Sequence, residues 1–131
     1  MRQPEPANQG LLASIQGMPL LQVQTSAKTA APAGLLKNLS AELARALGKP
    51  ESYVMVSFEH DAELLFGGTS EAACFAALKN IGTFTPAQTE KLSALLCQQL
   101  SAALGVAPNR IYIEFIDAKP HLWGHDGGTF A

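Results

Sequence analysis

Leucines recur at every fourth position in two stretches of the chain, and each stretch ends at a glycine. The first stretch holds Leu39, Leu43 and Leu47 before Gly48, and the same pattern returns 57 residues later, before Gly105. This spacing puts the leucines on one face of an α-helix, and a glycine after the last leucine is a common helix end. We therefore predict two amphipathic helices of matching design.

Each predicted helix is followed by a turn that contains a proline, and then by an apolar strand. The two strands cover 53–58 and 110–115, again 57 residues apart. Pro32 and Pro86 lie near the two helix starts, where a missing amide proton costs nothing. Residues 85–88 (Thr-Pro-Ala-Gln) resemble a capping box. Helix, turn and strand thus repeat as one unit.

The segment 71–81 is rich in alanine, and its local propensity alone favours a helix. The 57-residue offset places it opposite residues 19–25, which have the pattern of a strand leading into the first helix. Because tertiary context overrides weak propensity, we predict a strand over 72–82. The chain then holds two βαβ units with right-handed crossovers, which form one sheet with both helices on the same face.

The predicted strands carry apolar residues in succession, at 54–56 and at 111–113. Such runs are typical of strands that are buried on both faces. Since the two helices cover only one face, the other face needs another partner, and further copies of the chain are the simplest one. We therefore predict a symmetric homo-oligomer.

A chain of 131 residues with 47% apolar and 15% charged residues suits one domain with a well-filled core. We assign the domain to 19–131 and treat 1–18 as a disordered or non-native extension. A misassigned start codon and a cloning remnant are the alternatives. The extension lacks the apolar run of a signal peptide, so we expect a cytoplasmic protein, or one that is secreted without such a peptide.

A formal charge of −2 provides no basic field, which argues against nucleic acid and anionic membrane surfaces as partners. No apolar run approaches the roughly 20 residues that span a bilayer. Cys74 and Cys97 are too far apart for a redox motif, so we expect reduced, buried thiols. His60, His121 and His125 lack metal-ligand spacing; we expect exposed loop histidines, with neither a metal nor a cofactor.

The dipeptide Met18-Pro19 has two chemical interpretations. Inside a chain, Pro19 is a tertiary amide without a proton. If translation starts at Met18 and the methionine is removed, Pro19 becomes an N-terminal secondary amine, which is basic and nucleophilic. A free α-amine titrates at roughly 8, close to the working pH of an acid/base catalyst.

The chain resembles the tautomerase superfamily, and within it the macrophage migration inhibitory factor family with its microbial members. The order and spacing of several short motifs carry this resemblance, which extends from Pro19 to Ala131. The matching segments are 18–19, 48–50 (Gly-Lys-Pro), 66–71 (Phe-Gly-Gly-Thr-Ser-Glu), 80–82, 110–113 and 123–131.

The resemblance implies an α+β two-layer sandwich of duplicated β-α-β units, with a four-stranded mixed sheet and two antiparallel helices on one face. It implies a homotrimer with active sites at the subunit interfaces. The implied activity is keto–enol tautomerisation of aromatic 2-keto acids such as phenylpyruvate, with Pro19 as the acid/base. A signalling protein that binds a receptor and keeps a vestigial site is the alternative function, and a structural trimer is a weaker one.

The resemblance also assigns roles around Pro19. Lys49 would bind the substrate carboxylate and lower the pKa of the proline, although a lysine after a helix-ending glycine also complements the helix dipole. The backbone amide of Ile81 would contact the carboxylate, and Tyr112 would line the pocket from a neighbouring subunit. By residue type alone, Ile81 and Tyr112 would more often belong to the core.

Three further apolar residues are candidates for the pocket lining, with core packing as an equally good account: Leu20, Tyr53 and Val56. Glu114 stands where the mammalian members have a neutral Asn near the proline. A carboxylate there would raise the pKa of the proline and repel an anionic substrate, so weaker activity or a different substrate is expected. The Cys-x-x-Cys of mammalian relatives with thiol oxidoreductase activity is missing, which excludes that function here.

Overall fold

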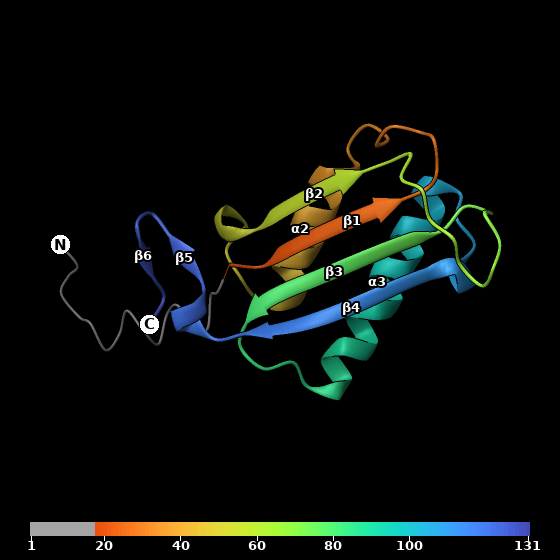
Figure 1. Ribbon diagram of the computed structural model, residues 1–131. Coiled ribbons are helices and arrows are strands. Elements are labelled where there is room, and N and C mark those ends of the chain that lie inside the picture. The colour runs from red at the N-terminus through yellow and green to blue at the C-terminus, as the bar shows by residue number, and fades with distance from the viewer. Residues whose placement is uncertain (1–17) are drawn as a thin grey trace.

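The computed structural model describes residues 18–131, and Figure 1 shows them as two layers. A four-stranded sheet of order β2-β1-β3-β4 forms one layer, and helices α2 and α3 form the other. The predicted extension falls almost entirely on residues 1–17, which lie outside the described residues. Within 18–131, no helix combines the length and apolar character needed to cross a bilayer.

The sheet consists of two parallel pairs that meet along one antiparallel edge. β1 (Leu20–Thr25) pairs in parallel with β2 (Met55–Glu59), and β3 (Cys74–Ile81) pairs in parallel with β4 (Ile111–Ala118). β1 and β3 pair antiparallel and join the two units. The two predicted βαβ units are therefore confirmed, and so is the strand predicted over 72–82.

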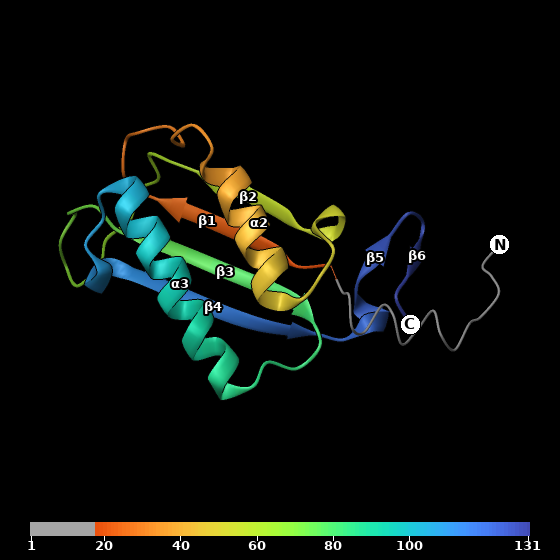
Figure 2. The ribbon, with the colours of Figure 1, turned by 180° about the vertical axis from the view of Figure 1, so that it is seen from behind.

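Helices α2 (Leu35–Leu47) and α3 (Pro86–Leu104) lie on the same face of the sheet, as Figure 2 shows. Each helix connects the two parallel strands of one pair. Because the two pairs run in opposite directions, the two helices are antiparallel to each other. Their leucines bury one continuous core against the sheet. The leucines concerned are Leu35, Leu39, Leu43, Leu92, Leu96, Leu100 and Leu104, and they meet Leu21, Val23, Ala76 and Leu78.

The ends of both helices follow the sequence signals. Thr85 caps α3 with a full capping box: its hydroxyl accepts from the Gln88 amide at 3.1 Å, and the Gln88 side chain accepts from the Thr85 amide at 2.9 Å. Gly48 and Gly105 end the helices with φ of 65° and 70°, left-handed values that glycine adopts without strain. The predicted glycine ends and the capping box of α3 are confirmed, whereas α2 begins at Leu35, three residues after Pro32, without a side-chain cap.

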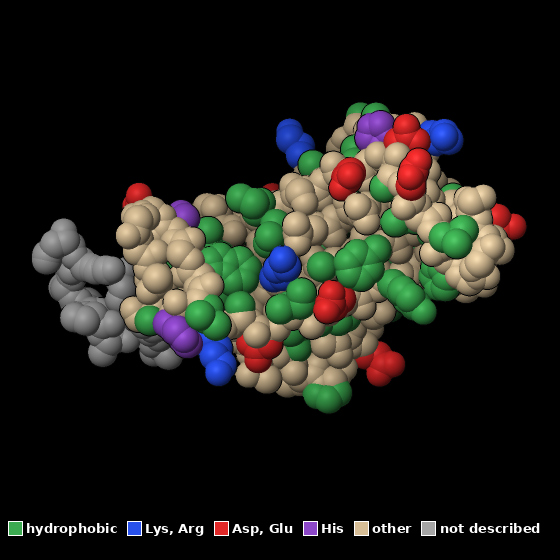
Figure 3. All heavy atoms as spheres, viewed as in Figure 1, with side chains coloured by type: hydrophobic (Ala, Val, Ile, Leu, Met, Phe, Trp, Pro, Cys, Tyr) green, Lys and Arg blue, Asp and Glu red, His purple; other side chains and the backbone are tan. Residues whose placement is uncertain are grey.

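The face of the sheet away from the helices is less apolar than the sequence analysis predicts. Alternation along the strands brings Met55 and Tyr112 to this face, where 62% and 64% of their surface is exposed. Polar residues such as Gln22 and Glu114 alternate with them. Figure 3 shows the result, with apolar side chains gathered over the strands and single charged side chains between them. We call this the open face.

A small hairpin extends the chain beyond β4. The short helix η3 (Pro120–Leu122) leads into β5 (Gly124–His125) and β6 (Gly128–Thr129). The two connecting residues, Asp126 and Gly127, have φ of 53° and 83°. Positive φ at both positions is the signature of a type I′ turn, for which Asp-Gly is a preferred sequence.

Candidate functional site

One end of the sheet gathers most of the residues expected at the site. Figure 1 shows the start of β1, the ends of β3 and β4, and the hairpin β5–β6 at this end. Pro19 is buried there, and its carbonyl accepts a hydrogen bond of 3.0 Å from the Met55 amide at the start of β2. β1 itself begins at Leu20, one residue after the predicted strand start. Pro19 is thus held by a sheet-type hydrogen bond and by burial.

Lys49 follows α2 in a rigid turn. The Gly48 amide donates to the Arg45 carbonyl at 3.3 Å, and the Lys49 amide donates to the Ala44 carbonyl at 2.9 Å. This pair of bonds is a Schellman motif, which satisfies the last carbonyls of the helix and fixes the backbone of Lys49. The Lys49 side chain is half-buried, and burial lowers the pKa of its ammonium group.

Tyr53 ends the short helix η1 (Glu51–Tyr53), which connects Lys49 to β2. Its ring meets the ring of His125 edge-on, with centroids 6.5 Å apart, and His125 stacks on Phe130 at 6.1 Å. The hairpin therefore packs against the site through aromatic rings. The expectation of a loop position for His125 is wrong, because this residue lies in β5.

Ile81 and Leu20 complete this end of the sheet. Ile81 is the last residue of β3 and is fully buried, whereas Leu20 is half-buried between Met55 and Lys79 of the neighbouring strands. Val56, the third candidate for the lining, packs against the core cluster beneath the helices. Its alternative role as a core residue is the one that the structure bears out.

Tyr112 and Glu114 lie elsewhere. Tyr112 pairs with Phe75 near the opposite end of the sheet, and its ring contacts that of Phe66 with centroids 4.7 Å apart. Glu114 pairs with Ala77 in the middle of the sheet. A single chain thus brings together Pro19, Leu20, Lys49, Tyr53 and Ile81, but it does not bring Tyr112 or Glu114 to them.

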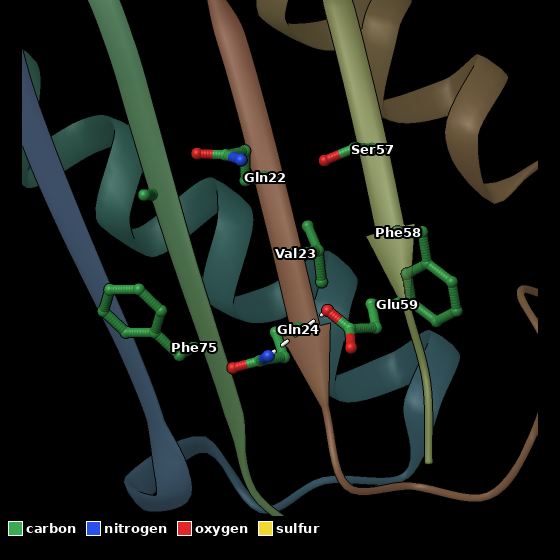
Figure 4. Close-up of a pocket in the computed structure, with 8 residues that line it drawn as sticks. Gln22, Val23, Gln24, Ser57, Phe58, Glu59 and Phe75 are labelled. Atoms are coloured by element: carbon green, nitrogen blue, oxygen red, sulfur yellow. Dashed lines mark hydrogen bonds between the residues drawn. The ribbon is translucent and has the colours of Figure 1, made fainter. Parts of the chain in front are cut away.

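A hollow on the open face was not predicted. This pocket has a volume of about 330 Å³. Figure 4 shows residues that line it: Gln22 and Gln24 of β1, Ser57 and Glu59 of β2, and Phe75 of β3. The Gln24 amide nitrogen donates to a Glu59 carboxylate oxygen at 3.2 Å. Polar residues alternate along β1 and β2, and this pattern indicates a solvent-exposed face. The apolar run at 54–56 instead led to the prediction that the strands are buried on both faces.

The two cysteines are free thiols in different environments. Cys74 is buried at the start of β3, and desolvation, with Cys97 as a second cause, raises the pKa of its thiol to about 11. Cys97 is partly buried, and its sulfur lies 3.8 Å from the Pro108 carbonyl oxygen. The expectation of buried thiols holds only for Cys74.

Two βαβ units in one mixed sheet, both helices on one face and a buried proline ahead of the first strand define a protein of the tautomerase superfamily. Within this class, the chain belongs to the macrophage migration inhibitory factor (MIF) family, because the sequence model of that family matches residues 18–131.

Individual relatives agree with this assignment. The macrophage migration inhibitory factor of Rattus norvegicus is 38% identical over 115 residues, which cover 87% of this chain and 100% of the rat protein. The crystal structure of a homologue from Prochlorococcus marinus is similar with a TM-score of 0.80 and 39% identity, over 86% of this chain and 99% of that one. The factor from Trichinella spiralis is also similar, with a TM-score of 0.80 and 34% identity over 84% of this chain and 98% of that one.

Proposed function

We propose that this protein is a keto–enol tautomerase of aromatic 2-keto acids such as phenylpyruvate, with Pro19 as the acid/base. The observation that carries the proposal is the buried position of Pro19 at the end of the sheet where Lys49, Tyr53 and Ile81 also lie. Family membership supports it, and the match to the family begins at Met18, directly before Pro19.

The chemistry needs one group that takes a proton from the carbon beside a carbonyl and returns it to the oxygen. A secondary amine at the start of the chain can do both, provided that a useful fraction is neutral at the working pH. Burial and a nearby cation disfavour the ammonium form and lower its pKa from roughly 8. Pro19 can therefore act as the acid/base only in a chain that lacks residues 1–18, because a peptide bond at its nitrogen makes the lone pair unavailable.

Lys49 is the proposed partner of the substrate carboxylate. The Schellman motif fixes the backbone at Lys49, so the side chain that carries the ammonium group extends from a defined position. The Ile81 backbone amide, at the end of β3, is the proposed second donor to the carboxylate. Leu20 and Tyr53 are half-buried at the same end and are proposed to line the apolar part of the pocket.

Replacing Lys49 tests this role. We expect Lys49→Ala to raise KM for phenylpyruvate about tenfold or more, because a hydrogen bond to a charged group contributes about 1.5–3 kcal/mol. Lys37→Ala removes an equally charged but exposed lysine from α2 and is the matched control. Steady-state kinetics on chains that begin at Pro19 make the comparison. An unchanged KM in Lys49→Ala would contradict the role.

The active form is proposed to be a homotrimer in which neighbouring subunits complete each site. Tyr112 and Glu114 are far from Pro19 in their own chain, and their exposed positions on the open face leave them available to a neighbour's site. Met55, Phe75 and Tyr112 expose apolar surface on the same face, and a subunit contact would cover it. In this arrangement Glu114 would raise the pKa of the neighbour's proline.

Sedimentation equilibrium tests the assembly. At micromolar concentration we expect a mass of three chains, and we expect Tyr112→Ala to reduce tautomerase activity without unfolding the monomer, since Tyr112 is exposed there. Leu122→Ala, which also removes an exposed apolar side chain, is the control. A monomeric mass for a fully active protein would exclude the trimer.

A further inference from the structure

Asn80 stands out among the buried polar side chains. It is the penultimate residue of β3 and has only 6% of its surface exposed. Its side-chain oxygen Oδ1 has no hydrogen-bond partner in the part of the chain that the structure describes. Thr25, the other buried polar residue there, differs because its hydroxyl donates to the Ala73 carbonyl at 2.8 Å. A buried acceptor without a donor costs free energy, so Asn80 calls for an explanation.

The register of the sheet places Asn80 beside Pro19. β1 and β3 run antiparallel with Leu20 opposite Lys79, so the next pair along the strands is Pro19 opposite Asn80. Side chains alternate between the two faces of a strand. Asn80 therefore shares the helix-facing side with Leu78, as Pro19 does with Leu21, and all four residues are buried.

The Met18–Pro19 peptide bond leaves the Pro19 nitrogen without a proton that it could donate to Asn80. As a tertiary amide, Pro19 has no N–H group to offer. An N-terminal proline differs, since its secondary ammonium group carries two N–H donors. In a chain that begins at Pro19, the buried acceptor and the group that would satisfy it thus lie on adjacent strands.

We propose that, in a chain that begins at Pro19, Asn80 Oδ1 accepts a hydrogen bond from the proline amine and thereby orients the amine and stabilises its protonated form. Asn80 is then a positioning residue for the acid/base. This inference rests on the proposed function, and it adds a residue that tunes the basicity of the catalyst from the protein interior.

Several charged or titratable groups lie at this end of the sheet and would add to the electrostatic field at the same amine. Lys49 lies after α2, and Tyr53, with His125 against it, lies on η1. Lys79 is opposite Leu20 on the open face, and Asp117 of β4 is opposite Asn80. Glu114 pairs with Ala77 in the middle of the sheet and is not one of the groups at this end of its own chain. All of them remain in the variants compared below, so the change at Asn80 alone is measured.

The experiment measures the pKa of the Pro19 amine by NMR titration of proline-labelled protein that begins at Pro19. A hydrogen bond that favours the charged form raises a pKa, so its loss in Asn80→Ala should lower the pKa by about one unit. Asn80→Asp places a carboxylate beside the ammonium and should raise it by about one unit or more. The acidic limb of the kcat/KM profile for phenylpyruvate should move in the same directions. Asn38→Ala, on the exposed surface of α2, is the matched control.

A pKa that stays the same in Asn80→Ala and Asn80→Asp would overturn the proposal, since a merely structural asparagine would alter stability but not the titration. If Asn80→Ala does not fold, Asn80→Ser replaces it and should lower the pKa by a smaller amount. The NMR titration needs no catalysis, so shifted pKa values in an inactive protein would refute the tautomerase function and leave this inference standing. Full activity with an unmoved pKa would refute this inference alone.

Discussion

A chain that begins at Pro19 should interconvert the keto and enol forms of phenylpyruvate, and the same chain with residues 1–18 attached should be at least about a hundredfold slower. General acid/base catalysis by one side chain or terminus contributes about 10²–10⁴-fold, and the attached segment removes the proton-accepting lone pair. The decay of enol absorbance measures the rate, and intact mass verifies the N-terminal residue of each preparation.

Two proline variants distinguish the catalytic role of the Pro19 amine from a general effect on the fold. Pro19→Gly keeps an N-terminal amine but replaces the secondary by a primary one and removes the buried ring, so we expect a large loss of kcat. Pro32→Ala, ahead of α2 and outside the site, should keep the rate. Equal rates for the long and the short chain would contradict catalysis by Pro19 and would favour the alternative of a binding protein.

Leu43→Ala should destabilise the protein by about 3 kcal/mol, the range found when a fully buried leucine is truncated. Leu43 has 0% of its surface exposed and lies in the middle of α2, against the core shared with the sheet. Alanine keeps the helix propensity, so the loss comes from the cavity and the lost apolar contact. Denaturant unfolding with a common slope m measures the change.

Leu122→Ala is the control for this effect, because 71% of that leucine is exposed. A surface truncation of this kind changes the free energy of unfolding by roughly 0.5 kcal/mol or less. If Leu43→Ala behaved like Leu122→Ala, the leucine stripe of α2 would not be the core face. The repeat-based account of the fold would then be wrong.

The internal repeat made most of the fold predictable. Periodicity alone located both helices, and the offset corrected local propensity at 72–82, where the alanines favour a helix but a strand forms. The reason is tertiary: Ala76, Ala77 and Leu78 are buried in a strand between β1 and β4, and their small side chains allow close packing there. Pro19, Lys49 and Ile81 were predicted as site residues through motifs in a family-like order, and they lie at the same end of the sheet.

Other features depended on which strands became neighbours. The open-face pocket arises from side chains of β1, β2 and β3, so no single segment contains its signal. His125 meets Tyr53 only because the hairpin folds back beside η1. Tyr112 and Glu114 lie away from Pro19 because β3 and β4 run parallel, which places the start of β4 at the opposite end of the sheet from the end of β3.

The sequence by itself determined the two βαβ units, the buried stripes of leucine and the chemical alternatives at Met18-Pro19, since these depend on spacing and on the covalent state of one nitrogen. Only the tertiary structure decided which residue lies opposite Pro19. The antiparallel register of β1 and β3 brings Asn80 there, with a side-chain oxygen that has no partner among the described residues, and register follows from how two distant segments bury their apolar faces together.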